Sequence, residues 1–364
     1  VRIPRVMVRR RVRVPPGPMT VTPGGGRFRP VPRYCPLVTR IRMRRLHVGR
    51  FGDGGAAWRD VDVPRRRPGT VRVRVTHASV GATDVLAAAG GYLLHPLPGF
   101  ATGYDIAGVV EEATGRAPGI RPGDRVAALL PGMGGHAEYV DVAPANLVPV
   151  PAGMDLATAA LLPLDGITAA LVAAHAEGAG VVFVAGASGP VGSLVAQRAL
   201  AAGATVVGSA SASNIAALEA RGIRGVDHSA ADWMQNARDA AGRDVDVAVD
   251  HRGDDRLRSL VSRRGVVVRT SFIGRPGHER GDTLRGSLSS AFRRAPRETV
   301  VSTPLTALFE PRRTSRLLAR VVGDVSAGTL APAEPEIVRP GDVLRDGRFV
   351  AHAGPGRKYV VAFE

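Results

Sequence analysis

The spacing of apolar and polar positions changes near residue 155. Before it, short segments alternate with a period of two, as in residues 71–75, and lie between turns rich in glycine and proline. After it come an alanine-rich helical pattern, an apolar run at 181–185, and helix-length and strand-length segments in turn. The first part predicts a compact β-rich domain and the second predicts a βαβ series, so the expected fold class is α/β.

The βαβ series predicts a parallel sheet with helices on both faces. Its further strands are expected at 205–208, 245–249 and 265–270, separated by helix-length segments. A helix around 313–322 and a closing strand at 358–363 are expected to return to the first domain. The predicted organisation is therefore a β-rich first domain at 43–164, a second domain built from the βαβ series at 165–300, and a return to the first domain at 301–364.

Residues 1–42 differ from the rest in composition. They contain eleven arginines, eight prolines and no acidic residue, so most of the net charge of +17 lies there. No periodicity is long enough to pack, and we expect this segment to be disordered. One interpretation is a misassigned start codon, with Met43 as the true first residue. The other is an arginine-rich arm for nucleic acid, although the aromatic residues of a stacking surface are missing.

Bulk properties exclude several classes of protein. A chain of 364 residues, 45% of them hydrophobic, can bury the cores of two domains, and its apolar runs end well short of the ~20 residues of a membrane span. The single cysteine, Cys35, excludes an intrachain disulfide and a zinc site of several thiolates. No signal peptide is evident. We expect a soluble, cytoplasmic protein without a membrane partner.

A glycine-rich turn directly follows the apolar run at 181–185. Three glycines at three-residue spacing let the backbone approach a pyrophosphate and direct a helix N-terminus at the phosphates. Alone the pattern is weak, but a strand before it, a helix after it and a second strand about 20 residues further on make it informative. The sequence therefore predicts a dinucleotide site with these residues: Gly186, Ala187, Ser188, Gly189, Pro190, Val191 and Gly192.

The end of the second strand bears on the choice of cofactor. An NAD site usually has an acidic residue there for the ribose 2′-hydroxyl, but residues 208–214 contain only small and hydrogen-bonding side chains. This favours NADP(H), with Ser209, Ser211 and Asn214 as candidate ligands. The loop has no arginine or lysine to pair with a 2′-phosphate, so a plain serine-rich turn stays open as the alternative.

Several segments together resemble one known family. They are Val73-Arg74-Val75 with Ala78-Ser79-Val80, the run 103–110, Pro122-Gly123-Asp124-Arg125-Val126, the run 135–140, the run 162–169, and the glycine turn. In order and spacing the chain resembles medium-chain dehydrogenase/reductases, particularly the quinone oxidoreductase and enoyl reductase branch. The resemblance implies a GroES-like catalytic domain beside a Rossmann doubly wound parallel sheet, with the active site in the cleft between them.

The resemblance also bears on the chemistry. Gly81 and Tyr104 stand where zinc-dependent members have a cysteine and a histidine ligand, so no metal is expected. Without a Lewis acid, a conjugated acceptor that spreads charge over an enolate is favoured: a quinone, an enone or an enoyl ester. The expected function is NADPH-dependent reduction of such a small molecule. The alternative is a non-catalytic NADPH-binding sensor or nucleic-acid-binding protein.

Three further site residues follow from the resemblance. Tyr92 matches a proposed proton donor, although it could equally pack its ring at the surface. Thr168 matches a threonine beside the nicotinamide, and otherwise it is a helix-start hydroxyl. His228 stands where some relatives place an aromatic residue against the 2′-phosphate, with a surface histidine as the alternative. A homodimer is the default expectation, and a nucleic-acid partner is not favoured.

Overall fold

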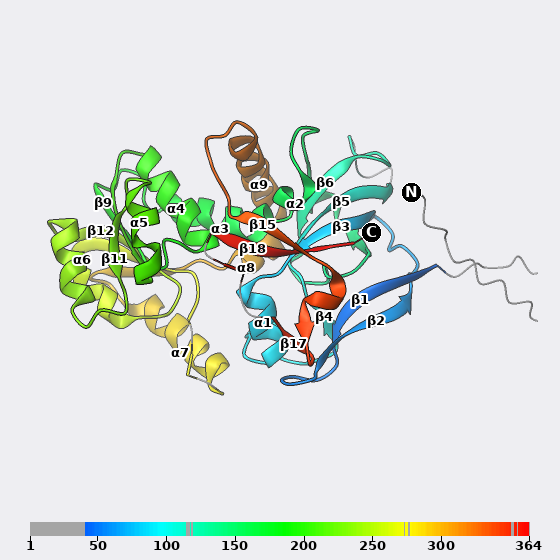
Figure 1. The fold of residues 1–364 in the computed structure, drawn as a ribbon, viewed down its shortest axis with the longest axis horizontal. Coiled ribbons are helices and arrows are strands. Elements are labelled where there is room, and N and C mark those ends of the chain that lie inside the picture. Colours follow the sequence, from blue (N-terminus) through cyan, green and yellow to red (C-terminus); the bar gives the residue numbers. More distant parts are fainter. Residues whose placement is uncertain are drawn as a thin grey trace, which may run out of the picture.

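The computed structural model describes residues 41–113, 117, 119–272, 274–275, 277–350, 353–354 and 356–363. The predictions for residues 1–40, including Cys35, lie outside this range. Figure 1 shows two sheet-based units joined by the long helix α3 (Leu162–Ala173). Within the described part of the chain, no helix has both the length and the apolar character needed to cross a membrane.

The first unit is built mainly from antiparallel strands. Its larger sheet has seven strands, in the order β15-β18-β3-β5-β6-β8, with β7 paired to β3. A second sheet has the order β2-β1-β4, and α1 (Ala82–Ala89) packs nearby. The strands from the first half of the chain are β1 (Arg42–Val48), β2 (Ala56–Asp62), β3 (Val71–Ser79), β4 (Phe100–Ala101), β5 (Asp105–Glu112), β6 (Arg125–Leu129), β7 (Tyr139–Val142) and β8 (Leu147–Pro149).

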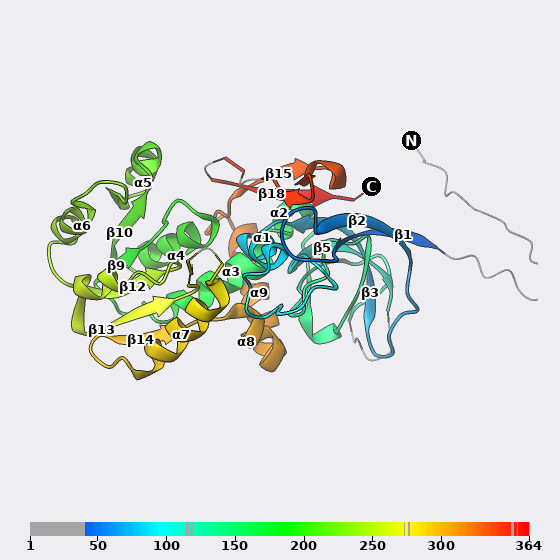
Figure 2. The same cartoon turned by 90° about the horizontal axis from the view of Figure 1, so that it is seen from below.

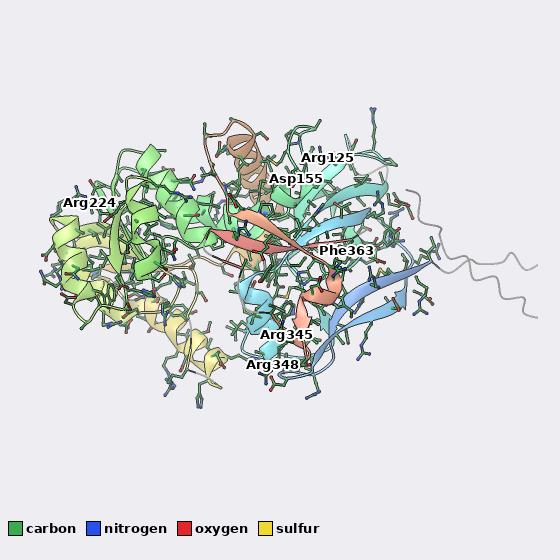
Figure 3. All side chains as sticks on the ribbon, in the orientation of Figure 1. Arg125, Asp155, Arg224, Arg345, Arg348 and Phe363 are labelled. Atoms are coloured by element: carbon green, nitrogen blue, oxygen red, sulfur yellow. The ribbon has the colours of Figure 1, made fainter. Side chains whose placement is uncertain are left out.

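The end of the chain completes this first sheet. Strand β18 (Arg357–Ala362) pairs antiparallel with β3, with Val360 opposite Ser79, and parallel with β15 (Glu334–Val338). The helix before it, α9 (Pro311–Ser326), covers the predicted region 313–322. After β15 the chain forms a small hairpin of β16 (Leu344–Arg345) and β17 (Arg348–Phe349), in which Asp346 and Gly347 adopt the positive φ of a tight turn. Figure 3 labels Arg345 and Arg348, one from each of these strands.

The second unit is a six-stranded, wholly parallel sheet, seen to the left in Figures 1 and 2. Its order, β11-β10-β9-β12-β13-β14, is that of a doubly wound sheet. The strands are β9 (Val181–Val184), β10 (Thr205–Ala210), β11 (Arg224–Asp227), β12 (Val245–Asp250), β13 (Val261–Arg269) and β14 (Arg297–Val300). Its helices include α4 (Pro190–Ala201), α5 (Ile215–Glu219), α6 (Trp233–Ala241) and α7 (Glu279–Phe292).

Burial on both faces explains the continuous apolar run of β9. Val182 and Val184 belong to the core that contains Leu194 of α4, whereas Phe183 belongs to the core around Trp233 of α6. Successive side chains of a strand point to opposite faces, so a strand covered on both sides needs apolar residues throughout. The central strand β9 is accordingly buried along its whole length.

One predicted crossover is wrong. A helix-length segment was expected between the strands at 245–249 and 265–270, but β13 already begins at Val261. Residues 251–260 are all that join the strands, and they form a short 3-10 helix, η3 (Asp255–Leu260), with Leu257 and Leu260 buried. The start of β13 carries Ser262, Arg263 and Arg264, and this polar sequence hides its strand character.

Candidate functional site

The glycine turn has a conformation that other residues could not adopt. Strand β9, the turn and helix α4 follow one another as expected, with Gly189 as the N-cap residue. Gly186 has a φ of 66°, in the left-handed region. A Cβ on Gly192 would lie 2.2 Å from the carbonyl oxygen of Gly186. The absence of side chains therefore lets the helix start close against the strand.

The turn is also tied to β10. The backbone N–H of Ala187 donates to the carbonyl of Ser209 (2.9 Å), and that of Gly186 donates to the Ser209 hydroxyl (3.2 Å). Pro190 occupies the first turn of α4, where it suits the helix but offers no N–H to an anion. Ser209 is thus a structural link between β10 and the glycine turn, and it is 5% exposed.

A cavity of about 470 Å³ opens beside this turn, at the carboxyl ends of β9, β10 and β12. Ligands of doubly wound proteins bind at this edge of the sheet. The cavity brings together five predicted residues, Gly186, Ser188, Ser209, Ser211 and His228. It does not include the other predicted residues, which are Tyr92, Thr168, Ala187, Gly189, Pro190, Val191, Gly192 and Asn214.

The loop after β10 hydrogen-bonds largely to itself. The Asn214 side-chain amide donates to the Ser211 hydroxyl at 2.9 Å. Nδ1 of His228 lies 2.8 Å from the Ala210 carbonyl, and a carbonyl can only accept, so Nδ1 carries a proton. Asn214 therefore positions Ser211, while His228 lines the cavity with one ring nitrogen already used.

The opposite wall of the cavity comes from residues after β12, which the sequence did not single out. Asp250 is buried, and its carboxylate accepts the N–H groups of Arg252 (2.9 Å), Gly253 (2.7 Å) and Asp254 (3.0 Å). Gly253 has a φ of 80°, which favours glycine. Three bonds to one carboxylate hold this turn in a single shape.

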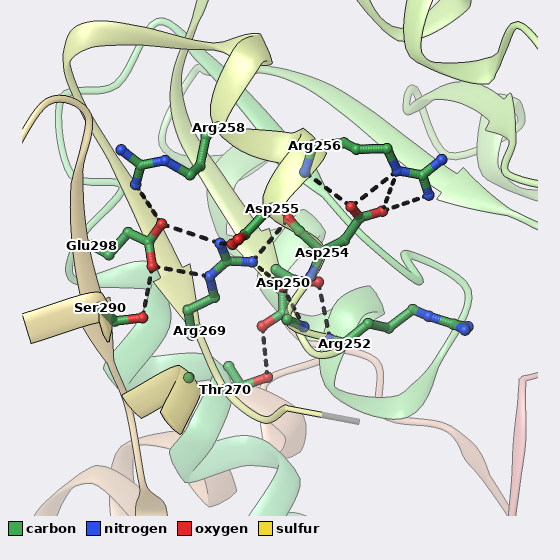
Figure 4. A network of polar contacts seen from close by, with 12 residues as sticks. Asp250, Arg252, Asp254, Asp255, Arg256, Arg258, Arg269, Thr270, Ser290 and Glu298 are labelled. Carbon is green, nitrogen blue, oxygen red and sulfur yellow. Dashed lines mark hydrogen bonds and ion pairs between the residues drawn. The ribbon is translucent and has the colours of Figure 1, made fainter. Parts of the chain in front are cut away.

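Asp250 also belongs to a network of ion pairs that we call the arginine cluster: Arg258, Arg269, Arg293, Asp250, Asp255 and Glu298. Figure 4 labels all of these residues except Arg293. The guanidinium of Arg269 is fully buried at the end of β13 and lies 2.5 Å from Asp250 and 3.2 Å from Glu298. The cluster joins the ends of β12, β13 and β14 and so supports the turn that lines the cavity. An arginine after the apolar residues 266–268 was the available sequence signal.

His251 lies directly against the glycine turn. A Cβ on Gly186 would be 2.7 Å from the imidazole Cε1, so this contact also requires glycine. Burial lowers the pKa of His251, and the carboxylate of Asp250 only partly opposes this effect. The imidazole is therefore neutral at neutral pH and adds no positive charge to the cavity.

Tyr92 lies in the first unit, in the loop that follows α1. Its hydroxyl accepts a hydrogen bond from the Tyr104 hydroxyl at 3.1 Å, and its ring stacks on His95 at 6.0 Å between centroids. Burial raises the pKa of Tyr92 to about 12, although the bond from Tyr104 opposes the shift. The phenol is protonated at neutral pH and, with Tyr104 donating to it, its own proton is free to bind another acceptor.

An arginine from the second unit holds this loop. Arg280 of α7 donates to the carbonyls of Pro96 (3.0 Å) and His95 (3.4 Å), and its guanidinium lies 5.0 Å from the Phe51 ring centroid. The contact links the parallel sheet unit to the Tyr92 loop. Sequence reasoning missed it because Arg280 belongs to no motif that the sequence analysis recognised.

Thr168 is buried on α3 and fully engaged as a donor. Its hydroxyl donates to the Leu164 carbonyl (2.6 Å) and lies 2.6 Å from the hydroxyl of Thr303, on α8 (Thr303–Phe309). Since Thr168 has a single proton, Thr303 must be the donor in that second bond. Towards any ligand, Thr168 therefore has only a lone pair to offer.

A second buried group of charges, which we call the lysine cluster, joins the two ends of the first unit: Lys358, Asp105 and Asp165. Lys358 of β18, the only lysine in the chain, lies 2.7 Å from Asp165 and 3.7 Å from Asp105. Asp105 also accepts the Ser79 hydroxyl and the Leu164 N–H, both at 2.7 Å. The cluster ties β18, β5 and the start of α3 together.

Comparison with known proteins shows which proteins this chain is similar to. Residues 67–152 match the alcohol dehydrogenase GroES-like domain. The chain is 32% identical to a quinone oxidoreductase of Pongo abelii over 46% of this chain and 53% of that one, and 32% identical to a 2-haloacrylate reductase of Burkholderia over 57% and 65%. It therefore spans only about half to two thirds of these relatives.

A solved structure covers nearly all of the fold. An alcohol dehydrogenase superfamily protein from Novosphingobium aromaticivorans aligns with 88% of this chain and all of its own, at a TM-score of 0.69 and 25% identity. Together these matches support assignment of the chain to the medium-chain dehydrogenase/reductase superfamily. Several of the curated relatives are named quinone oxidoreductase.

The two positions that the resemblance matches to zinc ligands, Gly81 and Tyr104, have other roles in this protein. Gly81 donates its N–H to Asp84 (2.8 Å), which also accepts the N–H of Gly103 (2.7 Å). Tyr104 is 1% exposed and directs its hydroxyl at Tyr92. Among the described residues, no group of three histidine, cysteine, aspartate or glutamate side chains is placed to hold a metal ion.

Proposed function

We propose that this protein is an NADPH-dependent oxidoreductase that reduces a conjugated carbonyl compound, such as a quinone, an enone or an enoyl ester, without zinc. The observation that carries the proposal is the 470 Å³ cavity against a glycine turn at the carboxyl ends of a doubly wound sheet. Relatives named quinone oxidoreductase and 2-haloacrylate reductase support the substrate class.

The residues of the cavity fit a dinucleotide. The glycine turn is a cradle that a Cβ at Gly186 or Gly192 would fill, so a pyrophosphate can approach its backbone. β10 ends at Ala210, with no carboxylate to repel a 2′-phosphate. The cavity would hold the adenosine end, and Thr168 would accept a hydrogen bond near the nicotinamide. When bound, the reduced nicotinamide supplies the hydride.

The protein's own part in the chemistry is the supply of a proton. Tyr92 keeps its proton at neutral pH because burial raises its pKa to about 12. Tyr104 donates to the Tyr92 oxygen and so stabilises the charge that grows there as the proton leaves. Gly81 and Tyr104 lack the thiolate and imidazole donors of a zinc site. A cytoplasmic location and a homodimer stay predictions from the sequence.

The test is oxidation of NADPH by the purified protein with quinones, enones and enoyl thioesters, together with variants that separate binding from chemistry. Gly189→Asp places a carboxylate at the N-terminus of α4, where it suits the helix as an N-cap but repels the pyrophosphate. We expect NADPH binding to be lost with the fold retained. Gly189→Ser is the matched control, because it is also a good N-cap but carries no charge, and it should bind NADPH far better.

Tyr92→Phe removes only a hydroxyl. It should leave NADPH binding intact and slow enone reduction by roughly 10²–10⁴-fold, the usual contribution of a positioned proton donor. Quinone reduction should suffer less, since the reduced oxygens can take protons from water. Equal losses on both substrates would show that Tyr92 acts by packing. NADPH binding without turnover of any acceptor would favour the non-catalytic sensor instead.

A further inference from the structure

The cavity contains one arginine whose charge is not matched. Its lining has two carboxylates, and each already has a cation: Asp250 binds Arg269 at 2.5 Å and Asp254 binds Arg256 at 2.7 Å. Arg256 is further occupied by the Trp233 ring, 5.2 Å from its guanidinium. His251 is neutral through burial. Arg252 is therefore the cationic side chain of the lining that forms no ion pair with a carboxylate of the described residues.

The side chain of Arg252 is free while its backbone is fixed. Its N–H donates to Asp250, which also holds the next two residues of the turn. The side chain is exposed and has no hydrogen-bond or ion-pair partner in the described part of the chain. Figure 4 shows it extending away from the arginine cluster, with no contact at its guanidinium. A rigid base with a free guanidinium suits a ligand that arrives later.

The wall opposite Arg252 is formed by the loops after β10 and β11. Ser211, His228 and Ser229 line the cavity there. The end of the second strand is where the ribose 2′ position lies in sites of this type, and here it carries no acidic residue and no basic one. A phosphate at that point would find hydroxyl donors on one side and the Arg252 guanidinium across the cavity.

We propose that Arg252 recognises the 2′-phosphate of NADPH and thereby sets the preference of this protein for NADPH over NADH. The proposal rests on the nucleotide site proposed above. A guanidinium binds phosphate through two parallel N–H bonds, a geometry that a single ammonium group cannot reproduce. The basic partner missing from the serine-rich loop is supplied instead from the turn after β12.

The experiment measures binding of two adenosine fragments, so it needs no turnover. The probes are adenosine 2′,5′-bisphosphate and 5′-AMP, which differ only in the 2′-phosphate, titrated calorimetrically into the full chain. Arg252→Gln should weaken the bisphosphate by roughly 10- to 100-fold, the loss expected for charge-assisted hydrogen bonds, and change 5′-AMP by less than about threefold. Arg252→Lys keeps the charge without the planar fork and should fall between.

The matched control is Arg221→Gln, which removes one exposed arginine from the same unit outside the cavity. It should change neither affinity, which separates a local contact from the general effect of charge. Equal losses of both probes in Arg252→Gln, or no loss of either, would overturn the assignment of Arg252 while leaving the nucleotide site standing. A wild-type protein that binds neither probe nor NADPH would overturn the site and this inference together.

Discussion

The arginine cluster has a buried centre of Arg269, Asp250 and Glu298, and the lysine cluster is buried too, but the two differ in how many cations they hold. The first has three arginines for three carboxylates, whereas the second has one lysine for two. For Asp105 in the lysine cluster, burial and the neighbouring Asp165 outweigh Lys358 and raise the pKa to about 7. Burial of Glu298 acts in the same direction, yet hydrogen bonds from Arg269, Ser290, Arg258 and Arg293 lower its pKa to about 2.

This difference teaches that burial alone does not decide whether a carboxylate keeps its charge. The number of hydrogen-bonded cations around it does, because each one offsets part of the cost of removing the charge from water. The arginine cluster is therefore expected to hold the cavity turn in the same state across the neutral range. The lysine cluster is expected to change its protonation there.

The largest expected effect is that of Arg269→Met, which removes the centre of the arginine cluster. It leaves Asp250 and Glu298 buried without their shared cation, and breaking a buried pair in this way costs about 3–5 kcal/mol in the free energy of unfolding. Urea unfolding at pH 7 measures this loss.

The matched control for Arg269→Met is Arg264→Met, an exposed arginine on the same strand β13. It should change stability by less than about 0.5 kcal/mol. A loss below about 1 kcal/mol in Arg269→Met would show that the cluster tolerates an uncompensated carboxylate, and the contrast with the lysine cluster would fail.

A smaller and pH-dependent effect is expected for Lys358→Met. At pH 6 much of Asp105 can be protonated, so the loss of the lysine leaves fewer buried charges and should cost about 1–3 kcal/mol. At pH 8 the solution supplies few protons, so Asp105 would have to stay charged without its cation or take up a proton at a free-energy cost, and the loss of stability should be greater. Urea unfolding at the two pH values tests this, and equal losses would contradict it.

The smallest effect is the pH dependence of the wild type. Because the pKa of Asp105 is raised in the native state, Asp105 binds more protons there than in the unfolded chain. Its contribution to the free energy of unfolding is therefore full below about pH 4 and is lost as the pH rises through about 7. Asp105→Asn should remove this slope between pH 5 and 7.5. Buried histidines such as His251, with lowered pKa, act in the opposite direction, so the difference between the wild type and the variant is the quantity to measure.

Glu298→Gln is the comparison for that slope. Because the pKa of Glu298 is lowered in the native state, the ionised carboxylate adds to the free energy of unfolding above about pH 4.5. That contribution is lost only as the pH falls towards 2. The variant should therefore be less stable than the wild type but keep the same slope between pH 5 and 7.5. A flattened slope in Glu298→Gln would mean that the arginine cluster also titrates near neutrality.

Much of the fold could be predicted because its signals are local. The glycine spacing at 186–192 reflects steric demands within a few residues, and the apolar run of β9 reflects burial on both faces. The short crossover η3 and the charged edge strand β14 were not predicted, since their polar sequences lack a clear period. The same holds for the site: the turn was found, but the wall that carries Arg252 was not.

Local order along the chain specifies which segments become strands, which turn needs glycine, and that β10 ends without an acidic residue. It does not specify which charges meet. Lys358 binds Asp165 across 193 positions, and Arg269 binds Asp250 across 19. Such pairs form only when packing brings distant strands together and excludes water, because in water the same charges attract each other weakly and have no fixed partner. The same reason applies to Arg252: its guanidinium can be identified as unpaired only in the folded structure, where the carboxylates of the cavity lining, Asp250 and Asp254, are paired with other arginines.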